Sequence, residues 1–382
     1  MALCNRRYFF IGRRKIMRTR MLHLLIKPAS SLCNLRCRYC FYCDVAENRN
    51  TLSYGIMEPQ TVDALLRQSF AYATGPVTFS FQGGEPTMAG LRYFADFCDK
   101  IPLYNTRSLP VQLALQTNGY ILDDDWCTFL AEHRFLVGVS LDGTARLHDA
   151  NRVNAAGEGT FSVVRDAIRR LKSHGVDTNI LCVVTDTLAR HGAEVYRYFR
   201  SQQFPFLQFI PQIPDFDTEG KDTLTAAHYG QFLNTTFQYY YEDFRRGQYR
   251  SVRLFDNFVR LAAGKAPECC GMDGQCHANL VVEADGSVYP CDFYVLDKWR
   301  MGNLCTDPIE TLLQSDTARA FLLSGGTIPE KCRTCPYVAL CRGGCRRHRE
   351  PHFATNRYCE AYRTFFAQNG TKIHEMARLC FG

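Results

Sequence analysis

The sequence has no hydrophobic run long enough to cross a membrane, because no window approaches about 18 consecutive apolar residues. The apolar stretch at residues 8–11 is too short for the core of a signal peptide. These two absences argue against a membrane-spanning protein and against a secreted one. We therefore expect the chain to remain in the cytoplasm.

The sequence also lacks a net charge over most of its length. Its formal charge of +7 arises from residues 1–20, which carry seven of the 45 Lys and Arg residues and no acidic residue. The remaining 38 basic residues balance the 38 acidic ones. A neutral body excludes a general affinity for nucleic acid or membrane surfaces, so neither is expected as a partner. Residues 1–20 are predicted to be a disordered basic extension, or an over-extended start with Met17 or Met21 as the true first residue.

Cysteine, by contrast, is abundant, with 19 residues in a chain of 382. Disulfides are rare in a reducing compartment, so clustered cysteines there predict metal or iron–sulfur sites and an oxygen-sensitive protein. The length exceeds one typical domain, and 46% of the residues are hydrophobic. We expect a large first domain and a smaller second one.

A tight cysteine loop follows the first apolar run, residues 23–29. It reads Cys33-x3-Cys37-x2-Cys40, with the aromatic residue Tyr39 before the last cysteine. Three thiolates hold three corners of a cubane iron–sulfur cluster and leave the fourth iron open for chemistry. A zinc knuckle or a set of buried thiols is the alternative interpretation.

At these residues the sequence resembles the radical SAM enzymes, whose signature is C-x3-C-x2-C with an aromatic residue before the third cysteine. The resemblance implies that the open iron binds the amino and carboxylate groups of S-adenosylmethionine. One electron from the cluster then cleaves this molecule to methionine and a 5'-deoxyadenosyl radical.

Between residues 21 and about 214, short β-rich runs alternate with amphipathic segments. Strands are expected at 23–27, 77–81, 111–116, 135–141, 178–184 and 206–210, and helices at 59–73, 93–101, 123–133, 161–174 and 189–202. This order predicts an α/β fold with a parallel sheet in a partial barrel, and together with the resemblance it implies a partial (β/α)6 radical SAM barrel over residues 21–228. In such barrels the chemistry lies at the carboxyl ends of the strands.

Polar motifs follow these strands. By the resemblance, Gln82-Gly83-Gly84-Glu85-Pro86 matches the GGEP motif that binds the amino group of the methionine moiety. Ser140 and Arg152 are then expected to contact S-adenosylmethionine, and Ile213 to pack on its adenosine. Without the resemblance, a plain loop, a turn cap, a surface ion pair and core packing are the ordinary explanations of these residues.

The segment at residues 229–263 is predicted to be a helical bridge. It is rich in aromatic residues, which we expect to serve core and interdomain packing rather than substrate contact. Beyond it, residues 264–382 form a predicted cysteine-rich second domain. Three further cysteines in predicted helices or strands are expected to be small buried residues: Cys98, Cys127 and Cys182.

Eight cysteines of the second domain have the spacing of cluster ligands. The pattern C-x2-C-x5-C-x3-C with a distant cysteine resembles the SPASM domain of peptide-modifying radical SAM enzymes. The resemblance implies two auxiliary iron–sulfur clusters. The first set is Cys270, Cys276, Cys291 and Cys345, and the second set is Cys332, Cys335, Cys341 and Cys359. A zinc ribbon is the alternative. Cys43 lies near Cys40 of the first loop and Cys269 beside Cys270, where each could be mistaken for a ligand.

Asp292 follows a ligand candidate, and a carboxylate there is placed to accept a proton from a substrate. Taken alone, a hydrogen bond to backbone amides is the more ordinary role. The stretch Val288-Tyr-Pro-Cys-Asp-Phe-Tyr294 and the segments at 27–31 and 206–210 resemble the anaerobic sulfatase-maturating enzymes, over residues 22–366. The resemblance implies that Asp292 is the general base.

The resemblance also implies a reaction. The deoxyadenosyl radical takes a hydrogen from Cβ of a cysteine or serine in an unfolded sulfatase chain with a Cys/Ser-x-Pro-x-Arg motif, which becomes Cα-formylglycine. Three [4Fe-4S] clusters, S-adenosylmethionine as co-substrate and a flavodoxin or ferredoxin as electron donor are expected. The alternatives are an enzyme that installs crosslinks in a precursor peptide, and a non-catalytic iron–sulfur electron carrier or zinc module.

Overall fold

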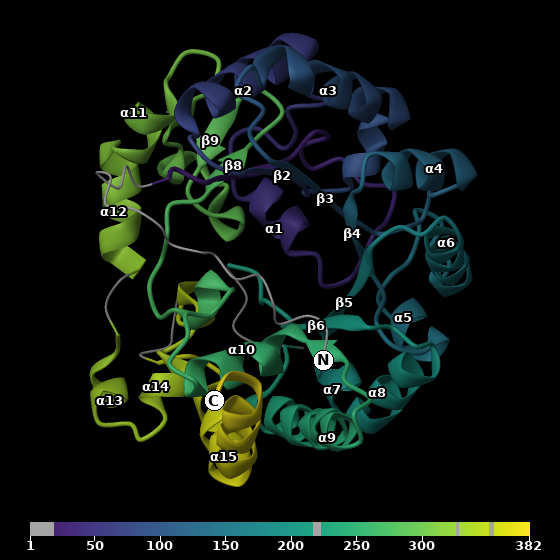
Figure 1. Cartoon of the computed structure of the whole chain (residues 1–382), viewed down its shortest axis with the longest axis vertical. Helices are drawn as coiled ribbons and strands as arrows, with labels where there is room; N and C mark the ends of the chain where they lie inside the picture. The colour runs from purple at the N-terminus through teal and green to yellow at the C-terminus, as the bar shows by residue number, and fades with distance from the viewer. Residues whose placement is uncertain (1–18, 217–222, 326–327, 351–354) are drawn as a thin grey trace.

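A single ten-stranded sheet forms the centre of the molecule (Figure 1), in the order β10-β9-β8-β1-β2-β3-β4-β5-β6-β7. The structure is a computed structural model that describes residues 19–216, 223–325, 328–350 and 355–382. Neighbouring strands from β1 to β7 are parallel, β8 is parallel to β1, and β9 and β10 are antiparallel to their neighbours. The strands are β1 Leu22–Ile26, β2 Val77–Phe81, β3 Val111–Thr117, β4 Leu136–Ser140, β5 Thr178–Val184, β6 Phe206–Pro211, β7 Ser251–Val252, β8 Leu280–Val282, β9 Ser287–Tyr289 and β10 Gly302–Asn303.

Most helices cover the outer side of the curved sheet, whereas α1 lies on its inner side (Figure 1). The α-helices are α1 Phe41–Glu47, α2 Pro59–Tyr72, α3 Leu91–Tyr104, α4 Asp124–Glu132, α5 Ala145–Asp149, α6 Phe161–Ser173, α7 Asp186–Ala189, α8 Gly192–Ser201, α9 Ala226–Arg245, α10 Arg253–Ala262, α11 Ile309–Leu313, α12 Asp316–Gly325, α13 Glu330–Arg333, α14 Val338–Cys341 and α15 Cys359–Phe381. Short 3-10 turns are η1 Pro86–Ala89, η2 Cys270–Met272, η3 Asp292–Tyr294, η4 Asp297–Trp299 and η5 Arg346–His348. In the described ranges, no helix combines the length and the apolar character that crossing a membrane requires.

Local sequence accounts for these elements. In β2, Val77, Phe79 and Phe81 alternate with less buried residues and are fully buried, as expected for a strand with a packed face. Helix α4 begins where the Asp123 side chain accepts a hydrogen bond of 3.0 Å from the backbone N–H of Trp126. Helix α6 buries Val164, Ala167, Ile168 and Leu171, the spacing of one helical face.

The predicted α/β barrel is confirmed, since all six expected strands pair in chain order. The helix expected at residues 189–202 corresponds to α8, which begins three residues later, at Gly192, and a separate short helix, α7, precedes it. The Thr185 side chain caps α7 by accepting from the N–H of Leu188, and α7 ends at Ala189. Of the predicted basic extension, residues 1–18 lie outside the described residues, and the Arg20 guanidinium packs over the ring of Tyr72.

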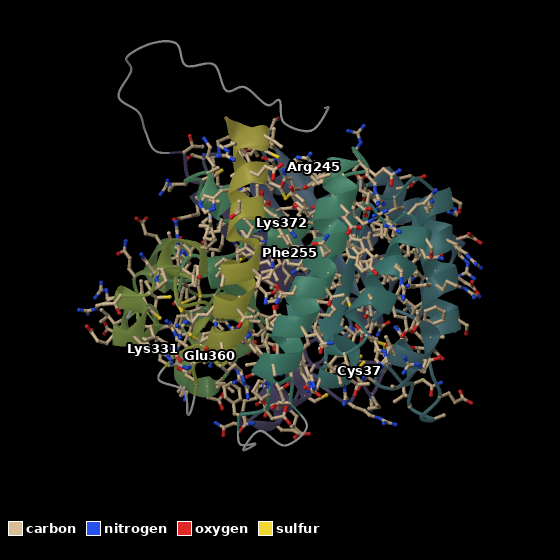
Figure 2. The ribbon with its side chains drawn as sticks, turned by 90° about the horizontal axis from the view of Figure 1, so that it is seen from below. Cys37, Arg245, Phe255, Lys331, Glu360 and Lys372 are labelled. Atoms are coloured by element: carbon tan, nitrogen blue, oxygen red, sulfur yellow. The ribbon has the colours of Figure 1, made fainter. Side chains whose placement is uncertain are left out.

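The predicted helical bridge at 229–263 contains a strand as well as helices. Strand β7 pairs with β6 and extends the parallel sheet, while α9 and α10 flank it. Helix α15 runs alongside α9 (Figure 2), where Lys372 donates to Gln238 at 2.7 Å. Phe255 is fully buried, with its ring 5.8 Å from that of Phe365 in α15. The aromatic residues of this segment therefore pack the C-terminal helix onto the barrel, as predicted.

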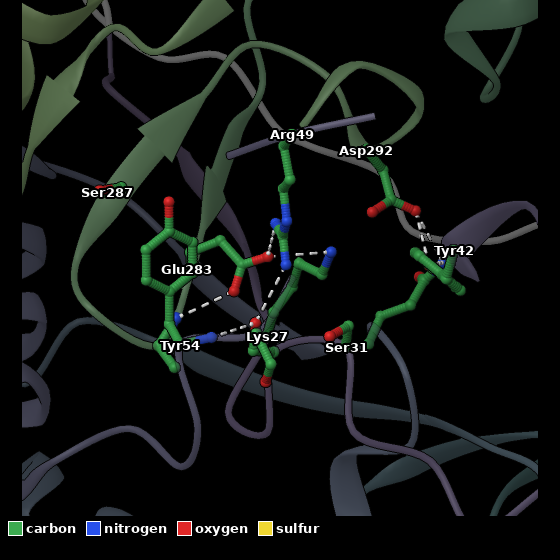
Figure 3. A network of polar contacts seen from close by, with 12 residues as sticks. Lys27, Ser31, Tyr42, Arg49, Tyr54, Glu283, Ser287 and Asp292 are labelled. Atoms are coloured by element: carbon green, nitrogen blue, oxygen red, sulfur yellow. Dashed lines mark hydrogen bonds and ion pairs between the residues drawn. The ribbon is translucent and has the colours of Figure 1, made fainter. Parts of the chain in front are cut away.

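The hairpin β8–β9 of the second domain joins the barrel sheet directly. Strand β8 pairs with β1, with Leu24 opposite Leu280 and Ile26 opposite Val282. At this junction the carboxylate of Glu283 meets Lys27 Nζ at 3.2 Å and Arg49 Nη1 at 2.6 Å (Figure 3). All three side chains are buried. Burial alone would raise the pKa of Glu283, but Lys27 and Arg49 outweigh it and lower the pKa to about 2.

We expect Glu283→Gln to reduce the free energy of unfolding at pH 7 by about 3–5 kcal/mol, because it leaves two buried cations without a counter-charge. The stabilisation by Glu283 is complete above its ordinary value of 4.5 and is lost as the pH falls toward 2. Anaerobic urea unfolding followed by circular dichroism measures the loss. Glu268→Gln is the control, since Glu268 forms an exposed pair with Arg260 and its loss should cost less than about 1 kcal/mol. Equal losses in the two variants would contradict the prediction.

Candidate active site

A cavity of about 360 Å³ opens at the carboxyl ends of the barrel strands. Its lining brings together every residue that the sequence predicted for binding the cofactor, the three cysteines of the N-terminal loop and the predicted base. These are Cys33, Cys37, Tyr39, Cys40, Gly83, Gly84, Glu85, Ser140, Arg152, Ile213 and Asp292. Residues more than 250 positions apart in the chain thus face one space.

The cysteine loop that follows β1 is held against the loop after α5. The backbone N–H of Arg36 donates to Val153 O at 2.7 Å, and that of Arg38 donates to Asn151 O at 3.0 Å. Burial raises the pKa of Cys33 to about 12 and that of Cys37 to about 11. A hydrogen bond from the Cys43 thiol lowers the pKa of Cys40 to about 6. Three thiols on one wall of a cavity fit a cluster with an open corner.

The Gly83-Gly84 turn packs against the backbone that leads into this loop. The N–H of Gly84 donates to Ser30 O at 3.0 Å, and the N–H of Glu85 donates to Leu32 O at 2.7 Å. A Cβ atom on Gly84 would lie 2.3 Å from Leu32 O, which is closer than real Cβ contacts come. Only glycine fits at this position, so the turn and the cysteine loop hold each other in place.

The buried carboxylate of Glu85 organises the end of the neighbouring strand β3. Its Oε1 accepts from the N–H and hydroxyl of Thr87 and from the hydroxyl of Thr117, at 2.7–3.1 Å. Its Oε2 accepts from the N–H of Asn118 at 2.7 Å. Each carboxylate oxygen has two lone pairs, so Oε2, which accepts one of these bonds, can accept one more, for example from an ammonium group.

Arg152 lies beside the cysteine loop in a buried ion pair. Its Nε donates to Asp142 Oδ2 at 2.9 Å, and the hydroxyl of Tyr39 donates to the same carboxylate. Arg152 also stacks over the Tyr39 ring and brings Nη1 within 4.0 Å of the Cys37 sulfur. Arg152 is 7% exposed, which rules out the surface ion pair considered as its ordinary role.

Asp292 forms hydrogen bonds with two side chains from the barrel. Its Oδ2 accepts from the hydroxyl of Tyr42 at 2.6 Å and from Gln82 Nε2 at 3.2 Å (Figure 3). Its Oδ1 is buried and has no hydrogen-bond partner among the described residues. Burial raises the pKa of Asp292, while the positive charge of Lys27 and the hydrogen bond from Tyr42 oppose this rise. The carboxylate thus keeps one oxygen free to accept a proton.

The eight cysteines of the second domain lie around two further spaces. A cavity of about 230 Å³ is lined by the first set, Cys270, Cys276, Cys291 and Cys345, together with Cys269 and Cys341. A small space near the start of α15 is lined by the second set, Cys332, Cys335, Cys341 and Cys359. Within the first set, the nearby thiols of Cys270 and Cys276 contribute to raising the pKa of Cys345. The first cavity and the barrel cavity share Ile213, Arg253 and Phe293 as lining residues.

Each set places four thiols around one space. Four thiols around a cavity match the four-cysteine ligation of a cubane cluster. Three other cysteines, Cys98, Cys127 and Cys182, are buried in the barrel, as predicted.

Sequence reasoning assigned no hydrogen-bonding or charge role to Asp142, Tyr42, Gln82 and Lys27. Each has a local signal, because Lys27 follows β1, Gln82 precedes the Gly-Gly turn, Asp142 follows β4 and Tyr42 follows the cysteine loop. Their partners are distant in sequence, however, and Lys27 reaches the ring of Tyr42 and the hairpin only in the folded chain. No pattern within one segment could assign these pairs.

Comparison with protein families places two known modules on the chain. The radical SAM superfamily matches residues 28–196, which hold the cysteine loop and the strands from β2 to β5. The SPASM family, described as an iron–sulfur cluster-binding domain, matches residues 270–336. The two matches correspond to the barrel and to the cysteine-rich region.

Whole-chain comparisons give longer matches. A cysteine-type anaerobic sulfatase-maturating enzyme of Clostridium perfringens is 43% identical over 90% of this chain and 95% of its own. A serine-type enzyme of Bacteroides thetaiotaomicron is 28% identical over 90% of this chain and 88% of its own. The solved structure of anSMEcpe with bound AdoMet and the Cp18Cys peptide superposes with a TM-score of 0.90 at 41% identity, covering 94% of this chain and 99% of that one.

We expect Gly84→Ala to weaken AdoMet binding about 5- to 150-fold, because a Cβ atom at this position displaces the cysteine loop and overpacking of this kind costs about 1–3 kcal/mol. Anaerobic equilibrium dialysis with labelled AdoMet measures the affinity. Gly370→Ala is the matched control, since a Cβ on Gly370 in helix α15 meets no atom within 4 Å. Unchanged affinity in Gly84→Ala would show that the turn does not position the loop.

Proposed function

Because the chain belongs to the anaerobic sulfatase-maturating enzymes, which are radical SAM proteins with a SPASM domain, we propose that it oxidises a cysteine of an unfolded sulfatase chain to Cα-formylglycine. The observation that carries this proposal is the position of Asp292, which lines the same cavity as the three loop cysteines. The choice of cysteine over serine is supported by 43% identity to a cysteine-type enzyme against 28% to a serine-type one.

We further propose which residues hold the cofactors. Cys33, Cys37 and Cys40 would bind the cluster that holds S-adenosylmethionine, and each set of four cysteines would bind one auxiliary [4Fe-4S] cluster. Tyr39, the Gly83-Gly84-Glu85 turn, Ser140, Arg152 and Ile213 would surround S-adenosylmethionine. When bound, this group supplies a radical able to take a hydrogen from an unactivated carbon, which no amino-acid side chain does.

The protein's own residues then have distinct tasks. Asp292 takes the proton of the target thiol on Oδ1, while Tyr42 and Gln82 hold Oδ2 in place. The substrate loses one hydrogen atom from Cβ, one proton to Asp292 and one electron toward the first cysteine set. The carbon–sulfur double bond that results is replaced by an aldehyde when water adds and hydrogen sulfide leaves.

The partners follow from this chemistry. A sulfatase chain with a Cys-x-Pro-x-Arg motif would bring the target cysteine into the barrel cavity before that sulfatase folds. A flavodoxin or ferredoxin would supply the electron that starts each turnover, and a reducing, oxygen-poor cytoplasm would preserve the clusters.

The experiment that tests the function follows the mass of a peptide that carries Cys-x-Pro-x-Arg. With reconstituted enzyme, reductant and S-adenosylmethionine under anaerobic conditions, we expect a loss of about 18 Da, as a thiol is replaced by an aldehyde, together with 5'-deoxyadenosine. The matching serine peptide should react more slowly. Deoxyadenosine without a change in the cysteine peptide would contradict the sulfatase assignment.

We expect Asp292→Asn to lower formylglycine formation at least about 100-fold while deoxyadenosine is still produced, because a general base contributes about 10²–10⁴-fold. Mass spectrometry and chromatography of the same samples measure the two products. Asp297→Asn is the control, since Asp297 lies on the same loop and is exposed. If Asp292→Asn retained full peptide conversion, another residue would have to be the base.

A further inference from the structure

The two cysteine sets of the second domain meet in one short turn. Cys341 is assigned to the second set and Cys345 to the first, and only Arg342, Gly343 and Gly344 separate them. All three of these residues have positive φ angles, between 50° and 79°, so the backbone turns sharply between the two sets. Any group that packs on this turn lies close to both sets.

Arg349 packs on this turn. Its Nη2 donates to Gly325 O at 3.0 Å, at the end of α12. Its Nη1 is buried, makes no hydrogen bond to any described residue, and would lie 3.5 Å from a Cβ atom on Gly343. Because an unpaired buried donor is costly, this nitrogen should have a partner that belongs to the loaded protein.

The charge of Arg349 is also unbalanced, unlike that of its neighbours. Arg342 pairs with Asp273 at 2.8 Å, Arg346 pairs with Glu350, and Arg347 lies 3.7 Å from Asp44. No carboxylate of the described ranges lies within ion-pair distance of Arg349. The positive charge of this residue is therefore available to the cysteine sets.

Arg349 lies beside the spaces of both sets. It lines the cavity of the first set together with Cys276 and Cys345, and Gly343, on which its Nη1 packs, lines the space of the second set. The second set lies near the surface, beside the exposed pair of Lys331 and Glu360 (Figure 2). The first set lies next to the barrel cavity. Arg349 thus lies between the first set, on the inside, and the second set, near the surface.

We propose that Arg349 is a positioning residue for electron transfer, which raises the reduction potentials of both auxiliary clusters. This inference rests on the cluster assignment of the proposed function. A cluster gains negative charge on reduction, so a nearby cation and a hydrogen bond to its sulfur stabilise the reduced form. With the clusters bound, the charge of Arg349 would favour their acceptance of the electron that the substrate loses, and an oxidised flavin or iron–sulfur protein would take that electron up.

The test is an anaerobic redox titration of the holoenzyme monitored by electron paramagnetic resonance, with S-adenosylmethionine present to distinguish the barrel cluster. We expect Arg349→Gln to weaken the electron affinity of the auxiliary clusters about tenfold, a shift of about 59 mV to more negative potential. Arg349→Lys keeps the charge and should shift less. Arg319→Gln removes an exposed arginine of α12 and should leave every potential unchanged. The barrel cluster should titrate identically in all four proteins.

Two results would overturn the inference. Unchanged auxiliary potentials in Arg349→Gln, with wild-type iron and sulfide content, would show that the charge does not tune the clusters. Loss of auxiliary iron from both Arg349 variants would give the residue a role in assembly instead. Failure of the cluster assignment itself is distinguishable, because the wild-type protein would then lack auxiliary cluster signals.

Discussion

The pairing of strand β8 with strand β1 is the constraint on which the rest of the site depends. The cysteine loop begins a few residues after β1, and Cys291 and Asp292 follow β9 of the same hairpin. The register between β1 and β8 therefore sets the position of Asp292 relative to the loop cysteines. A slip of one residue would turn every side chain of β8 to the other face of the sheet. The buried ion pairs of Glu283 with Lys27 and Arg49 favour a single register, because any other would leave a charge unpaired.

The parts of the molecule that could be predicted are those marked by a sequence pattern within one segment. Alternating hydrophobic residues identify the six barrel strands, and the spacing of the cysteines identifies the ligand candidates. The hairpin's place in the barrel sheet was not predictable, because β1 and β8 lie more than 250 residues apart and β8 has only three residues. The short helix α7 was missed for a different reason. It has only four residues, too few to show a helical period, and the Thr185 cap that begins it is a polar signal.

Asp142 illustrates why single residues of the site escaped sequence reasoning. In the sequence it is a turn residue after β4, for which capping is the ordinary explanation. In the structure its fully buried carboxylate pairs with Arg152 and accepts a hydrogen bond from the Tyr39 hydroxyl. It also accepts one from the N–H of Val183 at 2.9 Å. It holds in place two of the residues that face the loop cysteines. Burying the ion pair of Asp142 and Arg152 costs desolvation energy, so the pair serves to orient Arg152 and Tyr39 rather than to stabilise the fold.

The adjacency of Cys291 and Asp292 explains how one short segment serves two transfers. Cys291 has an extended backbone, with φ −157° and ψ 142°, and successive side chains of extended backbone point to opposite sides. Cys291 accordingly lines the cavity of the first cysteine set, while Asp292 lines the barrel cavity. In the proposed reaction a proton and an electron must both leave the same substrate residue. The proton has a carboxylate on one side of the segment and the electron has a thiolate-bound cluster on the other, so the two routes separate at neighbouring residues without crossing.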